Sequence, residues 1–169
     1  MLFRSNRNLG GFPDLDLVHR SVERVKELGW HLVMQIDGTD VEALTPLIKA
    51  LPVPFVIDHM GRCEADAGIE QPDFKKLLKL MRLDGAWIKV SCPERMTPYP
   101  YTAAVPFARA LMTARPDRVL WGTDFPHPNL KTPPDDFDLV DLVPRFAPSA
   151  AEQRLLLVEN PARLYEFND

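Results

Sequence analysis

Short apolar runs alternate along this chain with longer segments in which apolar residues recur every three or four positions. The runs are typical of buried strands, and the longer segments are typical of helices with one apolar face. Repeated strand–helix–strand connections are typical of parallel strands, because parallel neighbours cannot be joined by a tight turn and need a longer crossover. This alternation therefore predicts an α/β fold with a parallel sheet and outer helices.

Four such strand–helix units can be followed along the sequence. The predicted strands are 31–37, 54–59, 86–91 and 118–124, and the predicted helices are 13–28, 41–51, 74–81 and a segment that opens at 105. The first of these strands is expected to be buried on both faces, and Gly29 to end the helix before it. Nearer the C-terminus, Ser149 and Glu152 form a capping-box pattern. Asn160 and Pro161 are predicted to be the cap and first position of a last helix.

Composition excludes several classes of protein. A length of 169 residues, with 46% hydrophobic and 26% charged, predicts one globular domain, 1–169. The net charge of −4 and the absence of a basic run argue against a nucleic-acid partner. The apolar runs are far shorter than the roughly 20 residues of a membrane span. The first ten residues lack the pattern of a signal peptide, so we expect a cytoplasmic protein. Cys63 and Cys92 form no CxxC motif, which indicates two reduced thiols.

Polar residues gather where the predicted strands end. These residues are Asp37, Asp58, His59, Ser91, Cys92 and Asp124. In parallel sheets, ligands bind at the carboxyl ends of the strands, so this placement predicts a site there. No GxGxxG or GxxxxGK[ST] motif follows any of the strands, which argues against dinucleotide and P-loop sites.

Three of these strand-end segments carry a family resemblance. They are 58–62 (DHMGR), 91–95 (SCPER) and 121–129 (WGTDFPHPN), and 159–165 (ENPARLY) follows as a closing segment. Together they resemble the amidohydrolase superfamily, and within it the amidohydrolase-related group around the 2-pyrone-4,6-dicarboxylate lactonases. The resemblance covers about 29–167. It implies a (βα)8 TIM-type barrel, of which this chain would form the C-terminal portion.

The resemblance also implies a reaction and its residues. Asp124 would act as general base on water, and His59 would assist at the carbonyl group of a small carboxylated lactone. Arg62 and Arg95 suit the carboxylates of such a substrate, because a guanidinium group binds a carboxylate with two hydrogen bonds. His127 is a further candidate for contact with the substrate. The alternatives are a metal-dependent amidohydrolase or decarboxylase, and an inactive half-barrel that serves as an association module, with a homo-oligomer as one outcome.

Each of these residues also has a structural interpretation. Asp124 could cap a helix, His59 could be a hydrogen-bonded core residue, and the two arginines could lie on the surface. Cys92 is expected to be a buried, inert thiol. Lys89 stands inside an apolar strand, where a charge is costly unless it is paired, and its role stays open.

The chain also departs from the family pattern. A full barrel needs about 250 residues, and no His-x-His segment occurs here. We therefore expect either a fragment of a longer gene product, with at most marginal activity alone, or a chain that covers its open sheet edge by another route. Gln35 occupies a position where the pyrone lactonases have tyrosine, and Arg4 and Arg7 are left without a role.

No metal is expected at the site. The lactonase group that the chain resembles works without a metal, whereas many other amidohydrolases bind zinc or a similar ion. The alternative is a zinc ion held by His59, His127 and Asp124, since three ligands can leave an open coordination position.

Overall fold

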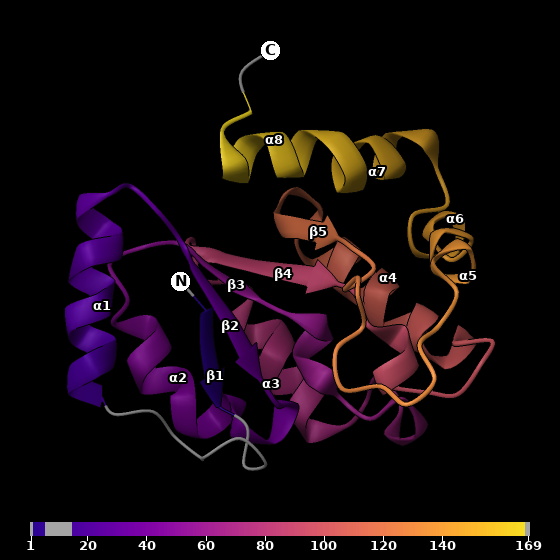
Figure 1. Cartoon of the computed structure of the whole chain (residues 1–169), viewed down its shortest axis with the longest axis horizontal. Coiled ribbons are helices and arrows are strands. Elements are labelled where there is room, and N and C mark those ends of the chain that lie inside the picture. Colours follow the sequence, from indigo (N-terminus) through magenta and orange to yellow (C-terminus); the bar gives the residue numbers. More distant parts are fainter. Residues whose placement is uncertain (1, 6–14, 168–169) are drawn as a thin grey trace.

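A five-stranded parallel sheet forms the centre of the molecule (Figure 1). The structure is a computed structural model, and it describes residues 2–5 and 15–167. The strands follow one another in chain order and are β1 (Leu2–Ser5), β2 (Leu32–Ile36), β3 (Phe55–Ile57), β4 (Ala86–Val90) and β5 (Val119–Trp121). Each strand is parallel to its neighbour, so all their carboxyl ends lie along one edge. The predicted parallel sheet is confirmed.

Helices connect these strands and cover the sheet (Figure 1). They are α1 (Leu15–Glu27), α2 (Val41–Lys49), α3 (Pro72–Leu80), α4 (Val105–Ala114), α5 (Asp136–Val140), α6 (Val143–Phe146), α7 (Ala150–Arg154) and α8 (Asn160–Tyr165). The main core lies between the sheet and the apolar stripes of the helices, where Phe74 and Phe107 pack edge to face. A smaller cluster of Val56, Trp87 and Leu120 is covered in part by Leu164 of α8. None of the helices in the described ranges is both long and apolar enough to cross a bilayer.

Strand β1 was not predicted from the sequence. It has only four residues, and it is a strand because it pairs with β2 from Leu2↔Val33 to Ser5↔Ile36. Arg7 lies outside the described residues.

Strand β2 also differs from expectation, because its burial alternates rather than being complete on both faces. Leu32, Met34 and Ile36 enter the main core, whereas Val33 and Gln35 are only half-buried on the other face.

The helix ends follow the sequence signals in part. The capping box at Ser149 and Glu152 is confirmed, and Gly29 takes the left-handed backbone, with φ of +67°, that ends α1. Leu28 is 59% exposed and does not belong to the apolar stripe. Asn160 does not cap α8, because the chain is already helical before it. Its buried amide instead donates hydrogen bonds to the carbonyl oxygens of Pro116 and Val119.

Candidate active site

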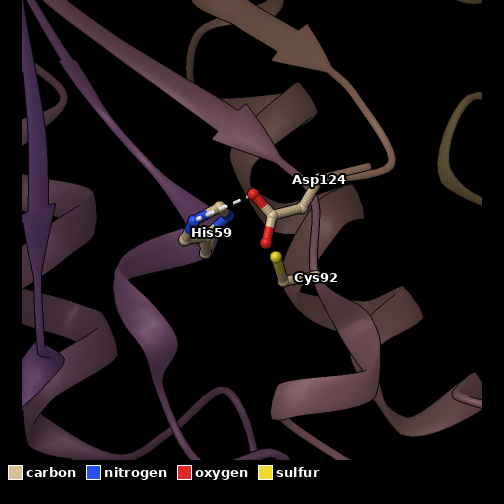
Figure 2. A group of neighbouring side chains, drawn as sticks. All are labelled: His59, Cys92 and Asp124. Carbon is tan, nitrogen blue, oxygen red and sulfur yellow. Dashed lines mark ion pairs between the residues drawn. The ribbon is translucent and has the colours of Figure 1, made fainter. Parts of the chain in front are cut away.

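Three polar side chains from separate strands meet at the carboxyl edge of the sheet. His59 follows β3, Cys92 follows β4, and Asp124 follows β5. Figure 2 shows the three side chains pointing toward one another. The Nε2 atom of His59 lies 3.8 Å from Oδ1 of Asp124. The structure therefore brings the two predicted catalytic residues together, although their catalytic roles stay predictions.

All three residues have left-handed backbone conformations. The φ angle is 57° at His59, 54° at Cys92 and 71° at Asp124. Such angles are uncommon outside glycine, asparagine and aspartate, and they persist only where surrounding contacts hold them. Within the turn after β3, Gly61 also has a positive φ, and a Cβ there would lie 3.0 Å from Leu77. Backbone strain of this kind is concentrated at functional sites, which favours a functional role for the carboxyl edge of the sheet.

His59 is held by hydrogen bonds on both ring nitrogens. The side-chain amide nitrogen of Gln35 lies 3.2 Å from Nε2, and the hydroxyl of Ser91 lies 2.8 Å from Nδ1. Because an amide nitrogen can only donate, Nε2 is the acceptor and Nδ1–H donates to Ser91. Burial lowers the pKa of His59. The ring is therefore neutral near pH 7, with its Nε2 lone pair engaged by the amide of Gln35.

We predict that His59 makes the free energy of unfolding depend on pH. Its pKa in the folded chain is lowered from the ordinary value of 6.5, so the unfolded chain binds the proton more readily. The stability due to neutral His59 is therefore complete above about pH 6.5 and is lost as the pH falls toward the folded-state pKa. Chemical denaturation at about pH 7.5 and about pH 5.5 should show a smaller loss in His59→Gln than in the wild type. Equal losses would contradict this prediction.

The two predicted substrate-binding arginines lie in different surroundings. The Nη2 atom of Arg95 is 3.6 Å from Oδ2 of Asp124, so this guanidinium belongs to the site. Arg62 instead donates from Nε to Oδ1 of Asp37 at 2.7 Å. It lines a separate hollow of about 460 Å³, together with Asp37 and Asp73, to which neither His59 nor Asp124 contributes. Of the two arginines, Arg95 alone lies beside Asp124.

Lys89 of β4 has a partner directly after the neighbouring strand β3. Its ammonium group donates to Oδ1 of Asp58 at 2.7 Å, and Asp58 is almost fully buried. This ion pair explains why a lysine is tolerated inside an apolar strand. It also adds a positive charge near His59, which contributes to the lowered pKa of that ring.

His127 lies in a buried cluster rather than beside the ring of His59. Its side chain is 4% exposed, and its Nε2 atom is 3.2 Å from Oδ1 of Asp136. On its other side, Nδ1 lies 3.9 Å from Oε1 of Glu94. This placement does not favour the predicted contact with substrate. Glu94 was not predicted at all, and its only sequence signal was its position directly before Arg95.

The site also contains a set of possible metal ligands. One donor atom from each of His59, Cys92 and Asp124 lies within 4.8 Å of the others, whereas the predicted zinc set had His127 in place of Cys92. The donors do not fit a metal well. The pKa of Cys92 is raised by burial and by neighbouring carboxylates, which disfavours the thiolate. Both nitrogens of His59 already have partners, and Arg95 places a positive charge beside Asp124.

Comparison with known proteins gives a consistent family assignment. The model of a family described as Amidohydrolase matches residues 2–167, which begins well before residue 29. The chain is 43% identical to a 2-pyrone-4,6-dicarboxylate hydrolase of Comamonas testosteroni, over 96% of this chain and 57% of that protein. It is also 43% identical to a 4-sulfomuconolactone hydrolase of Rhizobium radiobacter, over 92% of this chain and 54% of that protein.

A solved structure shows the same relationship. The crystal structure of a putative 2-pyrone-4,6-dicarboxylic acid hydrolase from Pseudomonas putida superposes with a TM-score of 0.85 at 27% identity. The match covers 100% of this chain and 63% of that one. The five strands and their helices thus form part of a TIM-type barrel, as predicted. The chain spans little more than half the length of the two curated relatives.

Proposed function

Because this chain belongs to the amidohydrolase family, we propose that its site hydrolyses a small lactone that carries carboxylate or similar anionic groups. The observation that carries the proposal is the meeting of Asp124, His59 and Arg95 at one edge of the sheet. Two relatives at 43% identity, named as hydrolases of 2-pyrone-4,6-dicarboxylate and of 4-sulfomuconolactone, support the class of substrate.

Asp124 is the general base of the proposed reaction. Its side chain is 21% exposed, so it can reach a water molecule while it is held beside Arg95 and His59. The carboxylate removes a proton from water, and the oxygen attacks the lactone carbonyl to give a tetrahedral oxyanion. The ring C–O bond then breaks, and the released oxygen takes back the proton. The product is the ring-opened hydroxy acid.

Arg95 and His59 support this reaction in different ways. The guanidinium of Arg95 binds an anionic group of the substrate, or the oxyanion as it forms, by charge-assisted hydrogen bonds. The neutral ring of His59, held by Gln35 and Ser91, lies 3.8 Å from Asp124 and helps to fix the position of that carboxylate. Arg62 and His127, by their contacts, do not share in these steps.

We propose that these residues work without a metal ion. The hydrogen bonds on both nitrogens of His59 and the positive charge of Arg95 support this. A metal-dependent amidohydrolase or decarboxylase is the second candidate. It is favoured by one observation, the close approach of donor atoms from His59, Cys92 and Asp124.

The assay follows the loss of pyrone absorbance on incubation with 2-pyrone-4,6-dicarboxylate. We expect hydrolysis by a version of the protein extended upstream to the length of its relatives, and at most marginal hydrolysis by this chain alone. Metal analysis of the purified protein should find no stoichiometric zinc, and a chelator should leave the rate unchanged. One equivalent of zinc, with loss of activity on chelation, would favour the metal-dependent candidate. Stable oligomers without turnover in either version would favour an association module.

A further inference from the structure

Two short loops carry Arg95 and Asp124, two residues of the proposed reaction. The Arg95 loop comprises residues 92–95 and follows β4, and the Asp124 loop comprises residues 124–129 and follows β5. Each contains left-handed residues, Cys92 in the first and Asp124, His127 and Asn129 in the second. The distance between Arg95 and Asp124 therefore depends on what holds these two loops together.

Direct contacts join the loops on the side of the site. The guanidinium of Arg95 donates from Nη2 to the carbonyl oxygen of Pro128 at 2.6 Å, and the same atom lies 3.6 Å from Asp124. Within the Asp124 loop, the backbone N–H of His127 donates to the carbonyl oxygen of Asp124 at 2.8 Å. His127 is thus fixed to the same turn that presents the carboxylate.

Beneath these contacts lies a buried pair that the proposed reaction does not use. The side chain of Glu94 is 5% exposed, and neither of its oxygens has a hydrogen-bond partner among the described residues. The Nδ1 atom of His127, 3.9 Å from Oε1 of Glu94, is likewise buried and without a partner. A buried carboxylate is costly unless an opposite charge compensates it. Burial accordingly raises the pKa of Glu94, and His127 faces its carboxyl group from the second loop.

The outer side of the His127 ring meets a second carboxylate. Its Nε2 atom lies 3.2 Å from Oδ1 of Asp136, a residue that is 43% exposed in its side chain. The ring therefore lies between two carboxyl groups, with Nε2 at hydrogen-bond distance from Asp136 and Nδ1 facing Glu94 at a longer distance. Four other charged or titratable groups interact electrostatically with Glu94. They are Arg95, Asp124, Tyr101 and Cys92.

We propose that Glu94, His127 and Asp136 form a chain of buried polar contacts that fastens the Arg95 loop to the Asp124 loop. Glu94 and His127 are then positioning residues, which fix the spacing between Arg95 and Asp124 without touching the substrate. The proposal rests on the proposed function only in taking Arg95 and Asp124 as the working groups. It assigns His127 a role different from the substrate contact that its sequence position predicts.

The cysteines provide a test that needs no turnover. Cys92 opens the Arg95 loop and is fully buried, and Cys63 is buried in the turn after β3, where burial raises its pKa to about 12. Loosening the loops should expose Cys92 while leaving Cys63 protected. The probe is iodoacetamide under native conditions, with the rate at each cysteine measured by mass spectrometry of the two peptides.

His127→Asn is the decisive variant. Asparagine adds no positive charge near Cys92 and so cannot by itself activate the thiol, which means that faster labelling reports opening of the loop. We expect Cys92 to react about tenfold faster in His127→Asn and in Glu94→Asp, which keeps the negative charge near Cys92 but withdraws the carboxyl group from His127. The double variant should show no further increase, because coupled residues are not additive. Cys63 should keep its wild-type rate in all three, and Glu70→Gln, an exposed control, should change neither cysteine.

Several results would overturn the proposal. These are a wild-type Cys92 rate in His127→Asn, single effects that multiply in the double variant, and equal acceleration of both cysteines, which reports global loosening. If His127→Asn does not fold, Asp136→Asn tests the chain from its exposed end, and an unchanged Cys92 rate there would also overturn it. Absence of lactone hydrolysis would count against the proposed function alone, since labelling is read without substrate.

Discussion

Replacement of Asp124 by asparagine should lower kcat for lactone hydrolysis by about 10³-fold in the upstream-extended protein, since general base catalysis contributes typically 10²–10⁴-fold. Asparagine has the shape of aspartate and tolerates the left-handed backbone at this position, where φ is 71°. The variant therefore removes the base while keeping the turn. The measurement is kcat from initial rates of pyrone loss, with unchanged far-ultraviolet circular dichroism as evidence of folding.

The matched control is Asp66→Asn, which changes an exposed aspartate. Its kcat should equal that of the wild type. If Asp124→Asn retains most of the activity, Asp124 is not the base, and another group must activate the water.

The second large effect concerns the two arginines. Arg95→Ala should raise KM for 2-pyrone-4,6-dicarboxylate by roughly 10- to 100-fold, because hydrogen bonds to charged groups contribute roughly 1.5–3 kcal/mol each. Arg62→Ala should raise KM by less than about 3-fold, since Arg62 is bound to Asp37 outside the site. Steady-state kinetics of the two variants side by side make the comparison.

Arg95→Lys separates charge from geometry. Lysine keeps the positive charge but loses the planar group that reaches both Asp124 and Pro128, so its KM should lie between those of the wild type and the alanine variant. Equal KM values for Arg95→Ala and Arg62→Ala would contradict the prediction that Arg95 binds the substrate and Arg62 does not.

The predicted strands were found because their signal is local. Runs such as that of β4, Ala86–Val90, are apolar and bounded by polar residues, so each can be identified without its neighbours. Strand β1 has four residues, one of them arginine, and depends on pairing with β2 across many intervening residues. Such a strand is set by a non-local contact that no window of sequence contains.

The sequence was enough to place the site at one edge of the sheet, but not to predict the contacts of its side chains. Asp124 and His59 were expected together because parallel strands bring their carboxyl ends to one edge, and the family resemblance added Arg62, Arg95 and His127 to the site. The partner of each side chain depends on rotamers and on the turns after the strands. The bond of Arg62 to Asp37 and the burial of His127 between Glu94 and Asp136 are results of that kind.

The pair of Lys89 and Asp58 has a consequence for anyone who redesigns this protein. Loss of Lys89 leaves the almost fully buried carboxylate of Asp58 without its ion-pair partner, whereas joint replacement by apolar residues of similar volume is often neutral. A library that randomises position 89 alone will therefore return little besides lysine among its folded members. A library that randomises positions 58 and 89 together can also yield an apolar pair. The two positions are therefore expected to change together rather than one at a time.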